Sequence, residues 1–326
     1  MTKFSSAVLA VAAIVAISVD AQAAGWPTRT VTLLVPFAAG SGTDLVARVI
    51  AASASEALGQ QIVIENAGGA GGTIGVSRAA RMAPDGYNMV MGAVDTFAQS
   101  QSLYARPNYD PLKDFTPVGL AVEQPILLTV NKNLPVKDIK EFVAYVKSNH
   151  AKMQFGSAGI GAAPYLACFS LNTEIGAEVT HVPYRGSAAA LADLMAGTLD
   201  YYCPLAGGAI PLMSGNLIKA LATLTPERSE LLPDLPTAKE EGVNATDGYY
   251  WMGFWFPAGT PQEIVNKMNG AIRSALSKPE VKARLREQAA TVVSEDRQSP
   301  EYLRKFDEEE ITKWTKIIKA AGIVPQ

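Results

Sequence analysis

Two glycine-rich turns have the residue types best suited to binding a ligand. The first runs from Pro36 to Asp44 (PFAAGSGTD) and the second from Phe155 to Ala162 (FGSAGIGA). Each follows an apolar run and precedes an amphipathic one, so each is expected to lead from a strand into a helix. Such a turn leaves backbone N–H groups able to bind an anion, and the positive end of the helix adds to the attraction. Two of them predict an anion site, provided that they face each other across a cleft.

Side chains at these turns favour a carboxylate as the anion. Asp44 is expected to serve as an N-cap or first-turn residue, because its charge would repel a carboxylate. Phe37 is expected either in the core or as an apolar wall of the cleft. The alternative for either turn is an ordinary connection whose glycines are needed for a positive φ. Hydroxyl groups that could donate without bringing charge belong to Ser41, Thr43, Thr96 and Ser157.

Other chemistries find less support in the sequence. A Gly-x-Ser-x-Gly nucleophile turn is absent, and only His150 and His181 could supply an imidazole base. We expect His181 to be a structural histidine bonded near a turn. The glycines at 68–72 lack the Gly-Lys-Ser/Thr ending of a phosphate loop, and the cysteine spacing is not a zinc pattern. The sequence therefore predicts no enzyme, no cofactor and no metal site.

The N-terminus predicts export of the chain. Lys3 precedes an apolar stretch at 7–19, and Ala21-Gln22-Ala23 matches a small-x-small cleavage site. We therefore expect a signal peptide at 1–23, cleaved near Ala23, and an exported protein that is not embedded in the membrane. An uncleaved anchor is the alternative. After export Cys168 and Cys203 could form a disulfide or remain two buried thiols, and the sequence leaves both open.

The 326 residues carry a formal net charge of −3, with no block of lysine and arginine, so a nucleic-acid partner is not expected. Periodicity predicts strands that alternate with helices, as in sheets covered on both faces. Strands are expected at 31–35, 62–64, 89–91, 153–155, 179–182, 199–203 and 218–222, and the segment 118–130 is expected to be extended but interrupted by Pro125. Helices are expected at 44–58, 73–81, 136–149, 163–175 and 188–196.

The last third of the chain follows a different pattern. The aromatic segment 248–257 precedes a turn in which Thr260 resembles an N-cap and Pro261 a first helical residue. Helical stretches near 264–276, 279–288 and 300–320 follow, with no strand expected between them. The length of the chain predicts two lobes, with the first crossing between them near 118–130, and we predict that these helices pack on the first lobe. Lobe I would then comprise 24–122 and 248–326, and lobe II would comprise 123–247.

These segments, taken in order, resemble the Bug family, the periplasmic solute-binding proteins of tripartite tricarboxylate transporters. The resemblance covers essentially the whole chain after the predicted signal peptide. Each motif is weak alone, and the order makes the set specific. The motifs are Trp26–Pro27, Val31–Phe37, Gly59–Gln60, Glu65–Asn66, Gly68–Gly72, Pro84–Tyr87, Phe115–Val118, His181–Gly186, Arg228–Ser229, Leu232–Asp234 and Pro257–Pro261.

The resemblance implies an α/β Venus-flytrap fold of two lobes, each with a parallel or mixed sheet, that close on a carboxylate held by backbone N–H groups and ordered water. It implies a monomer that delivers this ligand to membrane transporter subunits. The turn at Asp95 and Thr96 would add a third wall to the site. The implied ligand-binding residues are Phe37, Ala39, Gly40, Ser41, Thr43, Asp95, Thr96, Ser157, Ala158, Gly159, Gly161 and Ala162.

Two departures from the family pattern bear on the ligand. Many relatives have Ser-His-Leu where this chain has Pro164-Tyr165-Leu166, and an aspartate where it has Pro204. An amino acid's ammonium group needs a carboxylate partner, so we expect a dicarboxylate, tricarboxylate or aromatic acid instead. The alternatives are a secreted hydrolase of a carboxylated substrate and a ligand-sensing module for a signalling partner.

Overall fold

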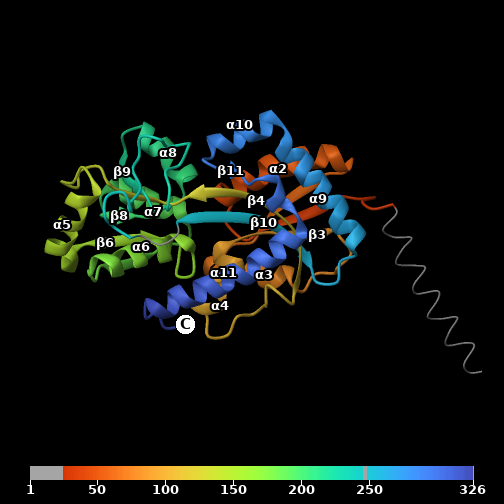
Figure 1. The fold of residues 1–326 in the computed structure, drawn as a ribbon, viewed down its shortest axis with the longest axis horizontal. Coiled ribbons are helices and arrows are strands. Elements are labelled where there is room, and N and C mark those ends of the chain that lie inside the picture. The colour runs from red at the N-terminus through yellow and green to blue at the C-terminus, as the bar shows by residue number, and fades with distance from the viewer. Residues whose placement is uncertain (1–24, 245–247, 326) are drawn as a thin grey trace, which may run out of the picture.

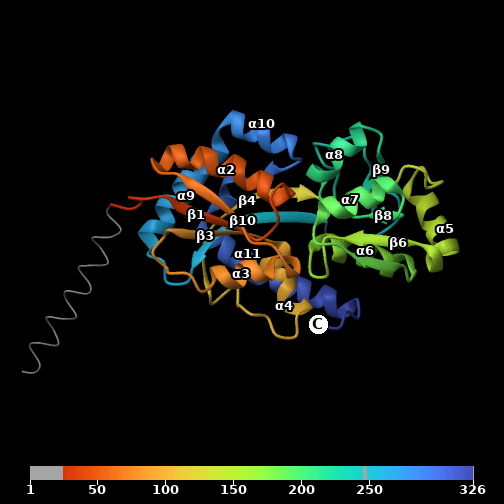
Figure 2. The ribbon, with the colours of Figure 1, turned by 180° about the vertical axis from the view of Figure 1, so that it is seen from behind.

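The computed structural model describes residues 25–244 and 248–325, and it has two lobes side by side (Figures 1 and 2). Each lobe is built on its own mixed sheet, which confirms the predicted two-lobed α/β fold. The predicted signal peptide at 1–23 lies outside the described residues. None of the helices in the described part of the chain has the length and apolar character that a membrane span requires.

Lobe I contains a six-stranded sheet in the order β11-β4-β10-β3-β1-β2. Strand β1 pairs in parallel with β2 and β3, whereas β10 runs antiparallel to β3 and β4. The strands are β1 (Val31–Val35), β2 (Ile62–Asn66), β3 (Asn88–Ala93), β4 (Phe115–Pro125), β10 (Tyr249–Pro257) and β11 (Thr291–Val292). Their side chains are largely buried because helices cover both faces.

Helices α2, α9 and α10 lie on one face of this sheet, and α3, α4 and α11 lie on the other (Figures 1 and 2). Helix α2 begins after Ser41 and ends at Gly59, whose φ of 69° suits glycine. The helical elements are α2 (Gly42–Leu58), η1 (Ala70–Gly72), α3 (Thr73–Ala79), η2 (Asp95–Gln99), α4 (Ser100–Leu103), α9 (Gln262–Ser277), α10 (Pro279–Glu287), η4 (Glu295–Gln298) and α11 (Pro300–Ala320).

Two buried acids fix the C-terminal helix α11 to β10. The indole N–H of Trp255 donates to Asp307 at 3.0 Å, and that of Trp251 donates to Glu310 at 2.7 Å. A buried carboxyl group needs such donors, because burial without hydrogen bonds is costly. Helix α11 therefore packs on β10 of the six-stranded sheet.

Lobe II contains a five-stranded sheet in the order β7-β6-β8-β5-β9, with β6 parallel to β7 and β8 and with β5 antiparallel to β8 and β9. Its strands are β5 (Leu127–Asn131), β6 (Gln154–Ser157), β7 (Thr180–Pro183), β8 (Tyr201–Tyr202) and β9 (Ile218–Thr223). Its helical elements are α5 (Ile139–Asn149), η3 (His150–Lys152), α6 (Ala163–Ile175), α7 (Ser187–Ala196) and α8 (Ala206–Ser214).

Two stretches of backbone connect the lobes, and they are bonded to each other. Ile126, between β4 and β5, donates its N–H to Gly248 at 2.9 Å and accepts one from Leu224 at 2.8 Å. Gly248 in turn donates to Leu224 at 2.9 Å, and a Cβ at Gly248 would lie 2.4 Å from the Leu224 carbonyl oxygen. The two connections therefore run side by side as a narrow hydrogen-bonded ladder.

Four local predictions were wrong. Strand β11 lies between α10 and α11. No strand was expected there, because a strand of two residues is too short to show a periodicity in the sequence. Helix α8 was missed, because its glycines and Pro211 disfavour a helix in isolation. Strand β8 spans two residues of the five predicted. Thr260 does not cap α9, because its hydroxyl donates to the Pro257 carbonyl and Pro261 is the N-cap residue.

Candidate functional site

The first predicted turn is held together by its own hydrogen bonds. Ser41 is the N-cap of α2 and accepts from the Asp44 N–H at 3.3 Å, while Asp44 accepts from the Gly40 N–H at 2.8 Å. The Gly40 N–H is therefore not available to a ligand, contrary to expectation. The N–H groups of Gly42 and Thr43 open the helix and have no intrahelical acceptor. They are the backbone donors that this turn can offer.

Asp44 is a buried first-turn residue, as expected, and it remains an anion. Burial by itself raises its pKa, but hydrogen bonds from Arg48, Asn66 and Gly40, together with the charge of Arg48, bring that pKa below its usual value. Its charge is thus compensated within lobe I. The predicted residue Ala39 lies beside it on the exposed rim of the turn.

The predicted third wall of the site, at Thr96, packs against the first turn through a glycine loop that includes Gly68 and Gly72. The sequence had not assigned this loop to the site. A Cβ at Gly72 would lie 2.7 Å from the Thr96 methyl group and 3.1 Å from the Phe37 ring. One at Gly68 would lie 3.4 Å from the Ala38 nitrogen. Phe37 is partly buried and packs against the core. Glycine at position 72 lets the loop, Phe37 and Thr96 approach closely.

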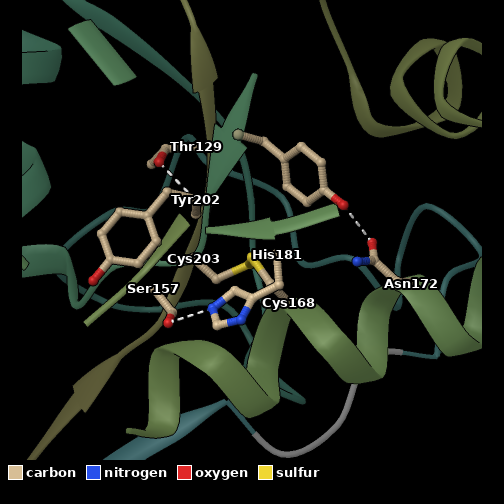
Figure 3. The surroundings of a disulfide bond; sticks show 8 residues. Thr129, Ser157, Cys168, Asn172, His181, Tyr202 and Cys203 are labelled. Atoms are coloured by element: carbon tan, nitrogen blue, oxygen red, sulfur yellow. Dashed lines mark hydrogen bonds between the residues drawn. A yellow bond between two sulfur atoms is a disulfide. The ribbon is translucent and has the colours of Figure 1, made fainter. Parts of the chain in front are cut away.

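The second predicted turn is organised around Ser157 and His181 (Figure 3). The Ser157 hydroxyl lies 2.7 Å from the His181 Nε2 atom and accepts the Gly159 N–H at 3.1 Å. The His181 ring lies between Phe155 and Tyr165, with ring centroids 4.9 and 4.7 Å away. As at Gly40, the N–H of Gly159 is used within its own turn.

The Ser157–His181 pair is not arranged as a nucleophile and its base. Burial lowers the pKa of His181 to about 4, so the imidazole is neutral and weakly basic at neutral pH. A catalytic histidine is normally oriented by a carboxylate on its other nitrogen. Within the described chain no carboxylate bonds His181, whose hydrogen-bond partner is Ser157. The histidine therefore positions the serine, which agrees with the structural role expected for it.

A disulfide joins Cys168 to Cys203, which answers the question that the sequence left open (Figure 3). Both cysteines are fully buried. Cys168 lies in α6, and Cys203 follows β8, the strand that pairs with β6 just before Ser157. The bond thus ties the helix that begins at Ala163 to the strand neighbouring the Ser157 strand.

The second predicted turn meets lobe I at the boundary between the lobes. The Tyr104 hydroxyl of lobe I donates to the Ala70 carbonyl at 2.9 Å and approaches the Ile160 carbonyl of lobe II at 3.3 Å. A Cβ at Gly71 would lie 2.9 Å from the carbonyl carbon of Gly161. One at Gly161 would lie 2.6 Å from the Tyr104 hydroxyl. Only glycine allows this approach of the lobes.

Asp95 lies where the two turns converge. Its carboxyl group accepts from the Thr96 N–H at 2.8 Å and from the Tyr250 hydroxyl at 3.1 Å. Tyr250 lies 3.5 Å from the Thr43 hydroxyl of the first turn. On the other side, the Ala163 N–H at the start of α6 also interacts with the Asp95 carboxyl group. The chain of contacts therefore runs from one lobe to the other.

The remaining predicted residues are Ala158, Gly161 and Ala162 of lobe II and Gly40 of lobe I. Gly161 and Ala162 are buried at the lobe boundary, and Ala158 is partly exposed beside Ser157. A Cβ at Gly40 would meet nothing within 4 Å, so Gly40 makes no interlobe contact there.

Three residues at the boundary, Tyr104, Ala163 and Tyr250, were missed because their positions depend on how the lobes meet. Across residues 25–244 and 248–325, no three His, Cys, Asp or Glu side chains gather to hold a metal ion.

Two lobes with mixed sheets, a paired backbone connection and polar turns at the lobe boundary are the architecture of a two-lobed solute-binding protein. The sequence matches the TctC family, described as tripartite tricarboxylate transporter family receptors, over residues 46–323. The chain belongs to this family, which confirms the resemblance found in the sequence. Members of this family and its structural neighbours are binding proteins.

Solved structures of relatives superpose closely on this chain. The periplasmic binding protein BugD is 36% identical, with a TM-score of 0.88 over 92% of this chain and 100% of BugD. MatC from Rhodopseudomonas palustris with bound malate is 39% identical, with a TM-score of 0.86 over 90% of this chain and 100% of MatC. The R. palustris protein Rpa4515 with adipate is 36% identical, with a TM-score of 0.88 over 93% of this chain and 100% of Rpa4515.

Proposed function

We propose that this receptor captures a small dicarboxylate between its lobes, in the periplasm, and delivers it to a tripartite tricarboxylate-type transporter. The observation that carries the proposal is that two similar structures, at 39% and 36% identity, hold malate and adipate, both dicarboxylates. The geometry at the lobe boundary supports it. Hydroxyl and backbone N–H groups from both lobes meet there, and such groups suit a carboxylate.

The donors of the proposed site come from both lobes, so a ligand would favour their closure. Lobe I would contribute the N–H groups of Gly42 and Thr43, and lobe II would contribute the Ser157 hydroxyl. A ligand that contacts both lobes binds the closed arrangement better than the open one and shifts the population toward it. This is the Venus-flytrap behaviour that we propose for the chain.

The sequence departures at Pro164, Tyr165 and Pro204 do not by themselves exclude an amino acid as the ligand. These departures remove an acid at Pro204 and an imidazole at Pro164 and Tyr165. The structure supplies an acid at the lobe boundary from Asp95 and an imidazole beside Ser157 from His181. The preference for dicarboxylates therefore rests on the ligands of the relatives and on the uncharged donors of the turns.

A thermal-shift screen followed by calorimetric titration tests the ligand class. We expect malate or adipate to raise the melting temperature in a saturable way, because a ligand that binds only the folded state stabilises it. Citrate, aromatic acids, aspartate and glutamate are the comparison set. Tight binding of aspartate or glutamate with no response to dicarboxylates would refute the proposed ligand class.

Two further experiments separate the receptor from the alternatives. Mass analysis after incubation should return the ligand intact, whereas a hydrolase would change its mass. Disruption of the gene should reduce uptake of the ligand, whereas a chemosensory module would leave uptake unchanged. The second experiment tests delivery to a transporter independently of binding.

A further inference from the structure

Asp95 occupies the position between the two predicted turns where an anionic ligand would be bound. It is 1% exposed, and its neighbours belong to both lobes: Tyr250 links it to Thr43, and Ala163 opens α6 on the facing lobe. Helix α6 has no side-chain cap of its own, since its N-cap residue is Ala162. The Asp95 carboxyl group therefore faces a helix N-terminus from across the lobe boundary.

Within residues 25–244 and 248–325, no lysine, arginine or histidine side chain bonds Asp95. Its partners are a hydroxyl group and backbone N–H groups. The titratable groups that interact with it are the phenols of Tyr104, Tyr109 and Tyr250, whose pKa values burial raises. Helix α11 also packs against η2, and its buried acids Asp307 and Glu310 are bonded to tryptophan N–H groups. An anionic Asp95 would thus be an isolated buried charge.

A dicarboxylate that enters this boundary brings like charge next to Asp95. Two carboxylates that share a site with low dielectric constant cannot both remain ionised at little cost, so one of them takes up a proton. Once protonated, a carboxyl group has an O–H to donate. Asp95 would then change from a group that repels the ligand to a group that binds it.

We propose that Asp95 couples ligand capture to proton uptake: it binds a proton from solvent as the dicarboxylate enters and donates that hydrogen to a ligand oxygen. This proposal rests on the proposed function, because it requires an anionic ligand at the lobe boundary. It assigns Asp95 a specificity role, since a neutral ligand would give no such coupling.

The acidity of the groups at the boundary agrees with this role. Burial raises the pKa of Asp95 to about 7, although bonds from Tyr250, Thr96 and Ala163 lower it. Asp95 is then partly protonated at neutral pH, and a nearby anion raises its pKa further. His181 does not compete, because its pKa of about 4 keeps it neutral above pH 6.

Calorimetric titration of the full chain with malate, and separately with adipate, tests the proposal. Repeating it at pH 7 in buffers of different ionisation enthalpy counts the protons bound. We expect uptake of about half a proton per ligand, and a Kd that is roughly tenfold weaker at pH 8 than at pH 6. Asp95→Asn should abolish most of the uptake and flatten the Kd between these pH values.

The matched control is Asp307→Asn. Asp307 is also a buried acid with a raised pKa, but it is bonded to Trp255 beneath α11. This variant should keep the proton uptake of the unmodified protein. Dicarboxylate binding without proton uptake in the unmodified protein would overturn the proposal and leave the proposed function intact, whatever the folding of Asp95→Asn. If neither dicarboxylate binds, the proposed function fails, and this proposal fails with it.

Discussion

At the scale of single residues, Ser157 is the side-chain donor of lobe II with the most fixed position. His181 and the Gly159 N–H both bond its hydroxyl. We expect Ser157→Ala to weaken dicarboxylate binding about tenfold, the effect of losing one hydrogen bond to a charged group. Calorimetric titration measures this loss. Ser53→Ala is the control, because the buried Ser53 hydroxyl has no partner in the described structure and lies in α2. Equal affinities in the two variants would remove Ser157 from the site.

Asp307 makes a separate prediction about stability. Burial raises its pKa to about 8, whereas the unfolded chain has a value near 3.8. The folded state therefore holds this proton more tightly. The associated stability is fully present below about pH 4 and is lost as the pH rises through 8. Urea unfolding at pH 5 and pH 9 should show a lower free energy of unfolding at pH 9.

Asp307→Asn should reduce that difference between pH 5 and pH 9. Asp95 shifts in the same direction, so part of the pH dependence should remain in the variant. An unchanged pH dependence in Asp307→Asn would show that Asp307 does not hold a proton in the folded protein. The Trp255 indole N–H can still donate to the amide oxygen of the variant, so the comparison changes charge more than shape.

At the scale of elements, the disulfide stabilises lobe II by closing a loop of 35 residues. The loop-entropy relation gives about 3–4 kcal/mol for a loop of that length. A variant with both Cys168→Ala and Cys203→Ala should lose stability of this order in chemical unfolding. Because both cysteines are buried, reductant added to the folded protein should act slowly. A double variant as stable as the unmodified protein would contradict the expected contribution.

Element prediction succeeded where local signals and tertiary packing agree. Helices α6 and α11 have the bounds that the sequence predicted, at 163–175 and 300–320, because each has a proline in its first turn and α11 also has apolar periodicity. Helix α8 forms although its glycines disfavour a helix. Gly207 is required by packing, since a Cβ there would lie 2.4 Å from the Gln288 carbonyl oxygen. Such a requirement comes from a distant segment and is not readable in the local sequence.

At the scale of the whole molecule, the sequence indicated which turns to examine but not how their donors are used. Gly40 and Gly159 were expected to present free N–H groups, and both bond within their own turns, to Asp44 and Ser157. The importance of Asp95 was suggested only by the family resemblance. Its contact with Ala163 depends on the relative position of the two lobes, which no periodicity encodes.

Closure itself can be tested at Gly71, where the lobes meet. An alanine Cβ there would lie 2.9 Å from the backbone of Gly161 in the other lobe, and backbone cannot move aside as a flexible side chain can. We expect Gly71→Ala to keep the lobes apart and to weaken dicarboxylate binding roughly tenfold or more, or at least about 1.4 kcal/mol. Small-angle scattering should then show that ligand no longer reduces the radius of gyration as fully as in the unmodified protein.

The matched control for Gly71→Ala is Gly176→Ala. Gly71 has a φ of 61° and Gly176 a φ of 68°, so alanine meets similar backbone strain at both, but a Cβ at Gly176 meets nothing within 4 Å. Gly176→Ala should lose a similar amount of stability yet bind and close normally. Equal affinity in both variants would mean that the Gly71 contact with Gly161 is not part of the ligand-bound state. The comparison separates strain within a lobe from contact between lobes, on which a receptor that binds by closure depends.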